Sequence, residues 1–389
     1  MKREKTQVII DDTTLREGEQ TPGVVFNLQD KVKIARHLDR VGVQRIEAGF
    51  PAASDGEMRA VKAIVAEGLN IEVFGFARAV KSDIDAVADC GCYGVMMSFP
   101  PSDIHLKHKL RLTRKEYLKR AVECVRYAKK KGLYITYSAE DSTRTDLEFL
   151  LTVFKKVIEN GVDCPRIVDT LGLATPHTIR NYVSAVKDIT DLPIEVHCHN
   201  DHGLAVANSL AAMEAGASII SSAVNGLGER AGVAATEEVI INLHNFYGIK
   251  NFHMKSLHSL CKIVEELSKV QIAPNKPVSG ENIFSHTSGI HQDAVLKHPV
   301  TYEPYPPELI GRTRKLILGK LSGSHAVKAK LEEFGINPDE AKLKEITEMV
   351  KKVSESRRSA LTDNEFLDLL QKIIPKRLDK QDLVVENKI

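Results

Sequence analysis

The chain has 389 residues, which is enough to bury a large core and to form more than one domain. Its hydrophobic fraction of 43% and charged fraction of 27% are ordinary for a globular protein, and its net charge of +2 argues against binding to nucleic acid or to anionic membranes. No apolar run has the length of a transmembrane helix or of a signal peptide. The six cysteines are scattered without a Cys-x-x-Cys pair, which indicates reduced thiols and a cytoplasmic location.

The first two thirds of the chain alternate between short β-rich runs and amphipathic helical runs. The β-rich runs are Val8–Asp12, Arg45–Phe50, Val73–Ala77, Gly94–Phe99, Tyr134–Ser138, Arg166–Asp169, Ile194–His199 and Ile219–Val224. Helical runs lie between them, and several end in glycine: Asp30–Gly42, Arg114–Gly132, Leu147–Gly161, Pro176–Ile189 and Ala205–Gly216. Eight strands that alternate with helices predict an α/β fold with a closed (β/α)8 barrel. An open doubly wound sheet is less favoured, because no Gly-x-Gly-x-x-Gly follows the first strand.

The pattern changes after the last barrel helix. Residues 269–322 carry Pro, Gly and Tyr without clear helical periodicity, which predicts a long connector or lid of the kind that is usually functional. Helices return between residues 323 and 376, for example at Asp339–Ser354 and Asn364–Ile373, and the charged tail 377–389 is expected to fray. We therefore expect a catalytic barrel over residues 6–268, followed by the connector, a C-terminal helical region and the tail.

The stretch Ile194–Asp201 contains two histidines with one residue between them. Side chains two apart on a strand point to the same side, so His197 and His199 can face one point. Taken without its flanking residues, a His-x-His pair is more often two structural histidines on a half-buried strand than a metal site. Because Asn200 and Asp201 follow at once, the strand ends in the kind of loop where (β/α) barrels hold their chemistry. Glu17, after the first strand, is a plausible third ligand, giving a His2Glu catalytic metal site with open positions.

Polar residues follow most of the other strands as well. These stretches include Asp12–Gln20, Glu47–Pro51, Arg78, Ser138–Arg144, Asp169–Gly172 and Asn225–Gly232. A cap or a core ion pair would explain any one of them. So many polar endings at one edge of a barrel favour a catalytic site there.

Three of these stretches carry a family resemblance. The motifs DTTLREGEQ, HCHNDHG and NGLGERAG resemble the DRE-TIM metallolyase superfamily, and most closely its Claisen-condensing branch of 2-isopropylmalate, homocitrate and citramalate synthases. The connector motifs SGIHQDAV and TYEPYPPELIGR match the same branch, so the likeness covers essentially the whole chain. The resemblance implies that acetyl-CoA and a 2-oxo acid condense on a divalent metal (Mg, Mn, Zn or Co) to give a hydroxy acid and free CoA.

The resemblance also implies roles for individual residues. The implied metal ligands are Glu17, His197, His199 and, more weakly, Asn225; the implied catalytic residues are Arg16, Glu140, His291 and Tyr302. Arg16 would stabilise the developing alkoxide at the keto oxygen, and either Glu140 or His291 would be the base. His291 and Tyr302 would come from the connector, often of the neighbouring subunit, which implies at least a homodimer. Thr170 and Gln20 would bind the 2-oxo acid, and Gly226, Gly228, Glu229 and Arg230 would lie against acetyl-CoA.

Several features of the sequence bear on the identity of the 2-oxo acid. The chain stops before a C-terminal regulatory domain could fit, and Glu rather than Asp follows Arg16; both features resemble homocitrate synthases and favour 2-oxoglutarate. Thr136 stands where the fungal and bacterial lysine-pathway enzymes have an arginine, so the resemblance is to the archaeal type. A second carboxylate needs a cation or several donors. Arg78 is the first choice for this role, ahead of His105, Lys107, Thr136 and Ser138. The alternatives, in order, are 2-isopropylmalate synthesis from 2-oxoisovalerate, citramalate synthesis, a retro-aldol lyase of the same superfamily and a non-catalytic metal-dependent sensor.

Overall fold

The computed structural model describes residues 8–373, which form two compact units. The first unit ends at Ile272 and the second begins at Ala273. Residues 6 and 7 of the expected barrel, residues 374–376 of the expected helical region and the expected charged tail, 377–389, lie outside the described residues.

The first unit is a closed parallel barrel of eight strands. The strands are β1 (Ile9–Asp12), β2 (Arg45–Gly49), β3 (Glu72–Arg78), β4 (Gly94–Ser98), β5 (Tyr134–Ala139), β6 (Cys164–Asp169), β7 (Glu195–Cys198) and β8 (Ile219–Ser222). Each strand pairs with the next in parallel, and β8 pairs with β1 to close the ring. The predicted (β/α)8 barrel is thus confirmed.

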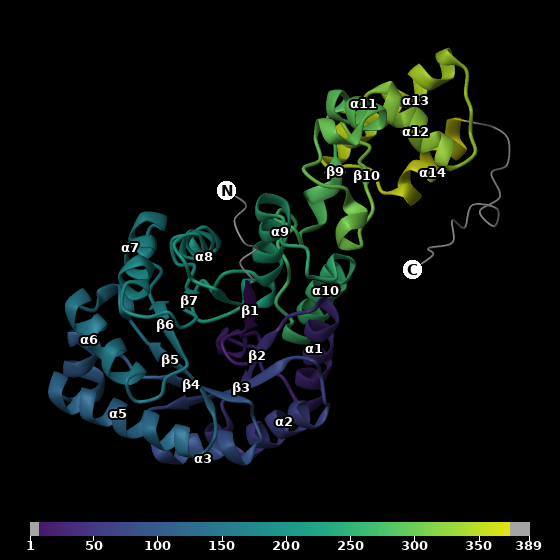
Figure 1. Ribbon diagram of the computed structural model, residues 1–389. Coiled ribbons are helices and arrows are strands. Elements are labelled where there is room, and N and C mark those ends of the chain that lie inside the picture. The colour runs from purple at the N-terminus through teal and green to yellow at the C-terminus, as the bar shows by residue number, and fades with distance from the viewer. Residues whose placement is uncertain (1–7, 374–389) are drawn as a thin grey trace. The chain divides into compact units, whose positions relative to one another are not determined.

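Helices surround the ring of strands (Figure 1). They are α1 (Leu28–Val41), α2 (Asp55–Ala66), α3 (Lys81–Asp89), α5 (Arg114–Lys130), α6 (Leu147–Ile158), α7 (Pro176–Lys187), α8 (Ala205–Glu214), α9 (Thr236–Tyr247) and α10 (Leu257–Ser268). Their limits follow from local sequence. Asn27 and Asp30 form a capping box at the start of α1, and Gly42 ends it with a φ of 88°, a conformation that glycine adopts without strain. Thr113 and Glu116 form the same box at α5.

A cluster of charged side chains forms what we call the floor of the barrel: Asp11, Arg45, Glu47, Arg166 and Glu195. Arg166 of β6 places Nη1 2.5 Å from Glu47 Oε1 and Nε 3.1 Å from Glu195 Oε1, and all three side chains are buried. Arg45 lies over the ring of Phe74, with 4.4 Å between its Cζ and the ring centroid. The pKa of the Asp11 carboxyl is raised well above its usual value by burial, and then by the nearby charges of Glu195 and Glu47.

This carboxyl makes the stability of the fold depend on pH. The folded state binds the proton of Asp11 more tightly than the unfolded state does. The resulting contribution of Asp11 to the free energy of unfolding is therefore fully present below the ordinary carboxyl pKa. It is lost as the pH rises through the raised pKa of the folded state. We expect Asp11→Asn to lessen the fall in the free energy of unfolding between about pH 5 and about pH 9, measured by urea denaturation with chelator present. Asp191→Asn, at a fully exposed side chain, is the matched control and should leave the curve unchanged. Parallel curves for Asp11→Asn and the wild type would contradict the prediction.

The second unit is mainly helical. It contains a two-stranded sheet of β9 (Ser285–His286) and β10 (Lys315–Leu316), together with α11 (Gly289–Lys297), α12 (Ser324–Glu333), α13 (Glu340–Arg357) and α14 (Asp363–Ile373). The last three helices pack around a shared apolar core that includes Leu331, Ile346, Val350, Phe366 and Leu370.

The connector, residues 269–322, contains the helix α11 although its sequence shows no clear helical periodicity. Helix α11 does not bury an apolar stripe: its buried residues are Gln292 and Val295, and Ile290 is 77% exposed. A buried polar residue helps to hold it instead: Gln292 Nε2 donates hydrogen bonds to the carbonyl oxygens of His286 and Ile317, each at 2.8 Å. Apolar periodicity therefore could not reveal this helix.

Two further properties bear on the class of protein. Across residues 8–373, the structure contains no helix with both the length and the apolar character needed to cross a bilayer. All six cysteines are free thiols with buried side chains.

Candidate metal-binding active site

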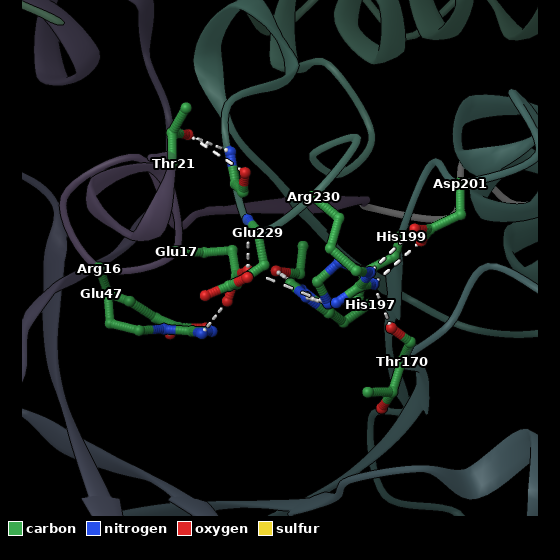
Figure 2. A network of polar contacts seen from close by, with 12 residues as sticks. Arg16, Glu17, Thr21, Glu47, Thr170, His197, His199, Asp201, Glu229 and Arg230 are labelled. Atoms are coloured by element: carbon green, nitrogen blue, oxygen red, sulfur yellow. Dashed lines mark hydrogen bonds and ion pairs between the residues drawn. The ribbon is translucent and has the colours of Figure 1, made fainter. Parts of the chain in front are cut away.

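Three side chains converge at the carboxyl ends of β1 and β7. The ligand atoms of Glu17, His197 and His199 all lie within 4.8 Å of one another, and all three residues are buried. The Nε2 atoms of the two imidazoles are 3.3 Å apart, and Glu17 Oε1 is 4.0 Å from His199 Nε2. Figure 2 shows Glu17 and the two histidines facing one another from opposite sides of the site.

A tight turn after β1 places Glu17. The backbone N–H groups of Arg16, Glu17 and Gly18 all donate to the carbonyl oxygen of Thr13, at 2.8 to 3.1 Å. The turn is tied to the barrel by Lys31 of α1, whose fully buried ammonium donates to the carbonyl oxygen of Leu15 at 3.1 Å. The loop that carries the carboxylate is therefore fixed before any ligand binds.

The electrostatic environment leaves both imidazoles neutral. Burial lowers the pKa of His197 well below its usual value, and the charge of Arg166 lowers it further. Burial also lowers the pKa of His199, although Glu17 opposes that shift. The Nδ1 atom of His199 is buried without a hydrogen-bond partner in the described structure, and His197 Nδ1 is 2.9 Å from Ser221 Oγ. Two neutral imidazoles and a carboxylate are donors that a divalent cation accepts, so the residues present fit such an ion.

Arg16 lies beside this site. Its Nε donates to Glu47 Oε2 at 2.6 Å, and its Nη1 pairs with Glu17 (Figure 2). Burial alone would raise the pKa of Glu47, but the charges of Arg16 and Arg166 outweigh it and lower that pKa to about 2. The guanidinium is thus held between two carboxylates.

A cavity of about 300 Å³ opens over these residues. Its wall consists of Arg16, Glu17, Gln20, Phe76, Met96, Ser98, Lys109, Ser138, Glu140, Arg166, Val168, Thr170, His197, His199, Glu229 and Arg230. Ten of these residues were singled out from the sequence. The other six, Phe76, Met96, Ser98, Lys109, Arg166 and Val168, were not predicted from the sequence. Several of these could have been found from strand alternation, since Arg166 and Val168 precede Thr170 by four and two positions and share its side of the strand.

Glu140 is held on the cavity wall by two neighbours. Lys109 Nζ donates to Glu140 Oε1 at 2.6 Å, and Ser98 Oγ lies 3.4 Å from Glu140 Oε2. The next residue, Asp141, is fully buried with a φ of 64°, and its backbone N–H donates to Thr170 Oγ1 at 2.8 Å.

Several residues proposed from the sequence do not line the cavity. Arg78 donates from Nε to Asp83 Oδ2 at 2.7 Å, and its side chain is 64% exposed. His105 Nδ1 lies 3.4 Å from Asp141 Oδ2, and Lys107 is exposed. Thr136 is fully buried, two positions before Ser138 on the same side of β5. Asn225 donates from Nδ2 to the carbonyl oxygen of Cys261 at 2.9 Å.

The glycine-rich loop after β8 packs against the turn after β1. Gly228 donates its N–H to Thr21 Oγ1 at 2.7 Å, and Glu229 donates its N–H to Glu17 Oε1 at 3.2 Å (Figure 2). Gly228 has a φ of 150°, and a Cβ there would lie 3.2 Å from Glu17 Cγ, so glycine permits the close approach. Arg230 is held by Asp201, with Nε 2.8 Å from Oδ1, and by the carbonyl oxygen of Thr170 at 2.6 Å.

His291 and Tyr302 belong to the second unit. Their ring centroids are 4.1 Å apart, with 37° between the ring planes. Both side chains are exposed within that unit, which makes them accessible to a ligand or partner.

The triad predicts a measurable metal affinity. His197→Ala leaves one imidazole and one carboxylate, so we expect the affinity for Mn²⁺ or Zn²⁺ to fall by about 100-fold or more, because even indirect ligand contacts are worth 10- to 100-fold. Isothermal titration of chelator-treated protein measures this directly. His177→Ala, at an exposed histidine of α7, is the control and should bind as the wild type does. Equal affinities of His197→Ala and the wild type would exclude the triad as the metal site.

Known proteins share both the fold and the sequence of this chain. Residues 7–266 match the family described as HMGL-like, and residues 278–358 match the homocitrate synthase post-HMGL domain-like family. The homocitrate synthase AksA of Methanopyrus kandleri is 48% identical over 377 residues, covering 97% of this chain and 95% of that protein. A probable 2-isopropylmalate synthase of the same organism is 49% identical over 350 residues, covering 90% of this chain and 70% of that protein.

Among solved structures, the HMG-CoA lyase of Bacillus subtilis superposes with a TM-score of 0.63 at 20% identity, covering 69% of this chain and 95% of that one. At that identity the likeness bears on the fold alone. The sequence matches confirm the resemblance inferred from the motifs, since the HMGL-like match spans more than half of the chain. The chain therefore belongs to the HMGL-like family, among relatives that include homocitrate, 2-isopropylmalate and citramalate synthases.

Proposed function

We propose that this protein condenses acetyl-CoA with a 2-oxo acid, with 2-oxoglutarate as the preferred substrate and homocitrate and CoA as products. The observation that carries the proposal is the placement of Arg16, Glu140 and the Glu17–His197–His199 triad on the wall of one cavity. Relatives named homocitrate synthase that align over nearly the whole chain support the choice of reaction.

The reaction joins two carbons and then cleaves a thioester. A base removes a proton from the acetyl-CoA methyl group, and the resulting enolate carbon attacks the keto carbon of the 2-oxo acid. Water then cleaves the thioester, giving the hydroxy dicarboxylate or tricarboxylate, free CoA and a proton. A divalent cation held by Glu17, His197 and His199 would act as a Lewis acid on the keto oxygen.

The chain's own residues provide the remaining roles. Arg16, pinned by Glu17 and Glu47, presents a preorganised cation where the keto oxygen becomes an alkoxide. Thr170 lines the cavity beside the triad and would donate its hydroxyl to the substrate carboxylate. Glu140 or His291 would be the base, and Glu229 and Arg230, with the turns at Gly226 and Gly228, would lie against acetyl-CoA. His291, Tyr302, the weak ligand Asn225 and a homodimer with exchanged connectors stay predictions from the resemblance.

The cavity wall bears on the choice of 2-oxo acid. Ser98 and Ser138 offer two hydroxyls on neighbouring strands β4 and β5, where a second carboxylate could be bound. Arg78 would have to leave Asp83 to reach it. Phe76, Met96 and Val168 are apolar residues on the same wall, and they favour the second candidate, 2-isopropylmalate synthesis from 2-oxoisovalerate. The 49% identical relative supports that candidate as well.

A substrate panel tests the proposed reaction. We expect CoA release from acetyl-CoA with metal and 2-oxoglutarate at a higher kcat/KM than with 2-oxoisovalerate, pyruvate or 2-oxoadipate, measured with a thiol reagent. A higher kcat/KM with 2-oxoisovalerate would identify the reaction as 2-isopropylmalate synthesis and exclude homocitrate synthesis as the main activity. Absence of CoA release with all four acids would refute the condensation itself.

Arg16 should matter for turnover more than for binding of the metal. Loss of one preorganised oxyanion donor typically costs about 3 to 4 kcal/mol, so Arg16→Gln should lower kcat by about 10²- to 10³-fold. Glutamine keeps a polar group beside buried Glu47, which is why it is preferred to alanine. Arg36→Gln, at a 59% exposed arginine paired with Glu67, is the control. Unchanged turnover in Arg16→Gln, with folding verified by circular dichroism, would remove Arg16 from the catalytic residues.

A further inference from the structure

The cationic side chains on the described cavity wall are held in different ways. Arg16 is bound between Glu17 and Glu47, and Arg166 is bound between Glu47 and Glu195 on the floor. Arg230 is held by both oxygens of Asp201 and by a backbone carbonyl. Lys109 instead pairs with Glu140, an acid on the cavity wall.

The segment that carries Lys109 is irregular. After the short turn α4 (Asp103–His105), residues Leu106–Leu110 form a π-helical turn, which ends at Arg111 with a φ of 55°. Such turns are rare in proteins overall, and those that occur are often at functional sites. Within this turn the Leu106 side chain is buried, whereas Lys109 extends to the cavity wall.

The same segment is anchored next to Glu140. Ser102 Oγ donates to Asp141 Oδ2 at 2.6 Å, and Arg144 Nε donates to Asp141 Oδ1 at 2.8 Å. The fully buried Asp141 carboxylate therefore joins the loop after β4 to the loop after β5. This anchor sets the distance between the Lys109 turn and Glu140 independently of the ion pair itself.

We propose that Lys109 is a positioning residue for Glu140. This role rests on the proposed condensation and takes Glu140, one of its two candidate bases, as the residue that exchanges a proton with the reacting acetyl group. Lys109 binds Oε1 and Ser98 lies near Oε2, so the carboxylate is held in one orientation at the cavity wall. Without the ammonium, the Glu140 side chain would rotate among several rotamers, and proton transfer requires a fixed geometry of about 3 Å between the atoms involved.

The pair has little to contribute to stability. The Lys109 side chain is 50% exposed and Glu140 is 24% exposed, and exposed ion pairs are screened by water. A change at Lys109 should therefore leave folding intact and affect turnover. This contrast separates positioning from a structural role.

Kinetics of four variants test the proposal. Lys109→Met keeps the length of the side chain and removes its charge, and we expect kcat to fall by about 10- to 100-fold while the KM of the 2-oxo acid changes by less than about threefold. Lys109→Arg should restore most of the turnover. The double variant Lys109→Met/Glu140→Gln should be no slower than Glu140→Gln alone, because a positioning residue has no effect once its target is gone. Metal affinity and Tm should match the wild type throughout.

Lys129→Met is the matched control, since Lys129 is 48% exposed and pairs with Asp163 on the outside of the barrel at 2.7 Å. Equal kcat values for Lys109→Met and Lys129→Met would overturn the positioning role. Multiplicative losses in the double variant, or an effect on the KM of the 2-oxo acid alone, would do the same. If the wild type releases no CoA with any acid, the proposed function is refuted, and the role of Lys109 with it. If the wild type is active and only the Lys109 results fail, the positioning role alone is refuted.

Discussion

A continuous set of buried ion pairs connects the floor of the barrel with the metal-binding triad. Glu195 pairs with Arg166, Arg166 with Glu47, Glu47 with Arg16, and Arg16 with Glu17. Removing one member would leave its neighbour charged and buried, which costs about 3 to 5 kcal/mol in comparable cases. The orientation of Glu17 is therefore maintained by charges on three other strands or loops. A site built in this way needs little rearrangement before it binds a cation.

Strand periodicity explains which parts of the site could be predicted. His197 and His199 are two residues apart on one strand, and Glu17, Glu140 and Thr170 follow other strands of the predicted barrel. Closure of eight parallel strands brings all of these ends to one mouth, so their approach follows from the fold. The eight strands themselves were recognisable from short β-rich runs separated by capped helices.

Other features depend on tertiary contacts that leave no periodic signal. Lys109 reaches the cavity from a π-helical turn, whose register no apolar pattern specifies. Arg78 ends a strand, as a substrate-binding cation would, but Asp83 lies five residues on and binds its guanidinium. Helix α11 was missed because a buried glutamine, and not an apolar stripe, fastens it. For Arg78 and for α11 the deciding contact is made by a single polar side chain, that of Asp83 or of Gln292.

Two lysines of this barrel form ion pairs that differ in their burial. Lys31 is fully buried between Glu19 and Glu57, at 2.6 and 2.5 Å, and it also binds the backbone of the turn that carries Arg16 and Glu17. A lysine without water must keep its partners, because an unpaired buried ammonium costs several kcal/mol. Lys109 is half exposed, so its pair with Glu140 contributes little to folding, in contrast to the pairs of Lys31. The turn that carries Glu17 is thus fixed by the buried lysine, whereas Glu140, a candidate base on the cavity wall, is paired with the exposed one.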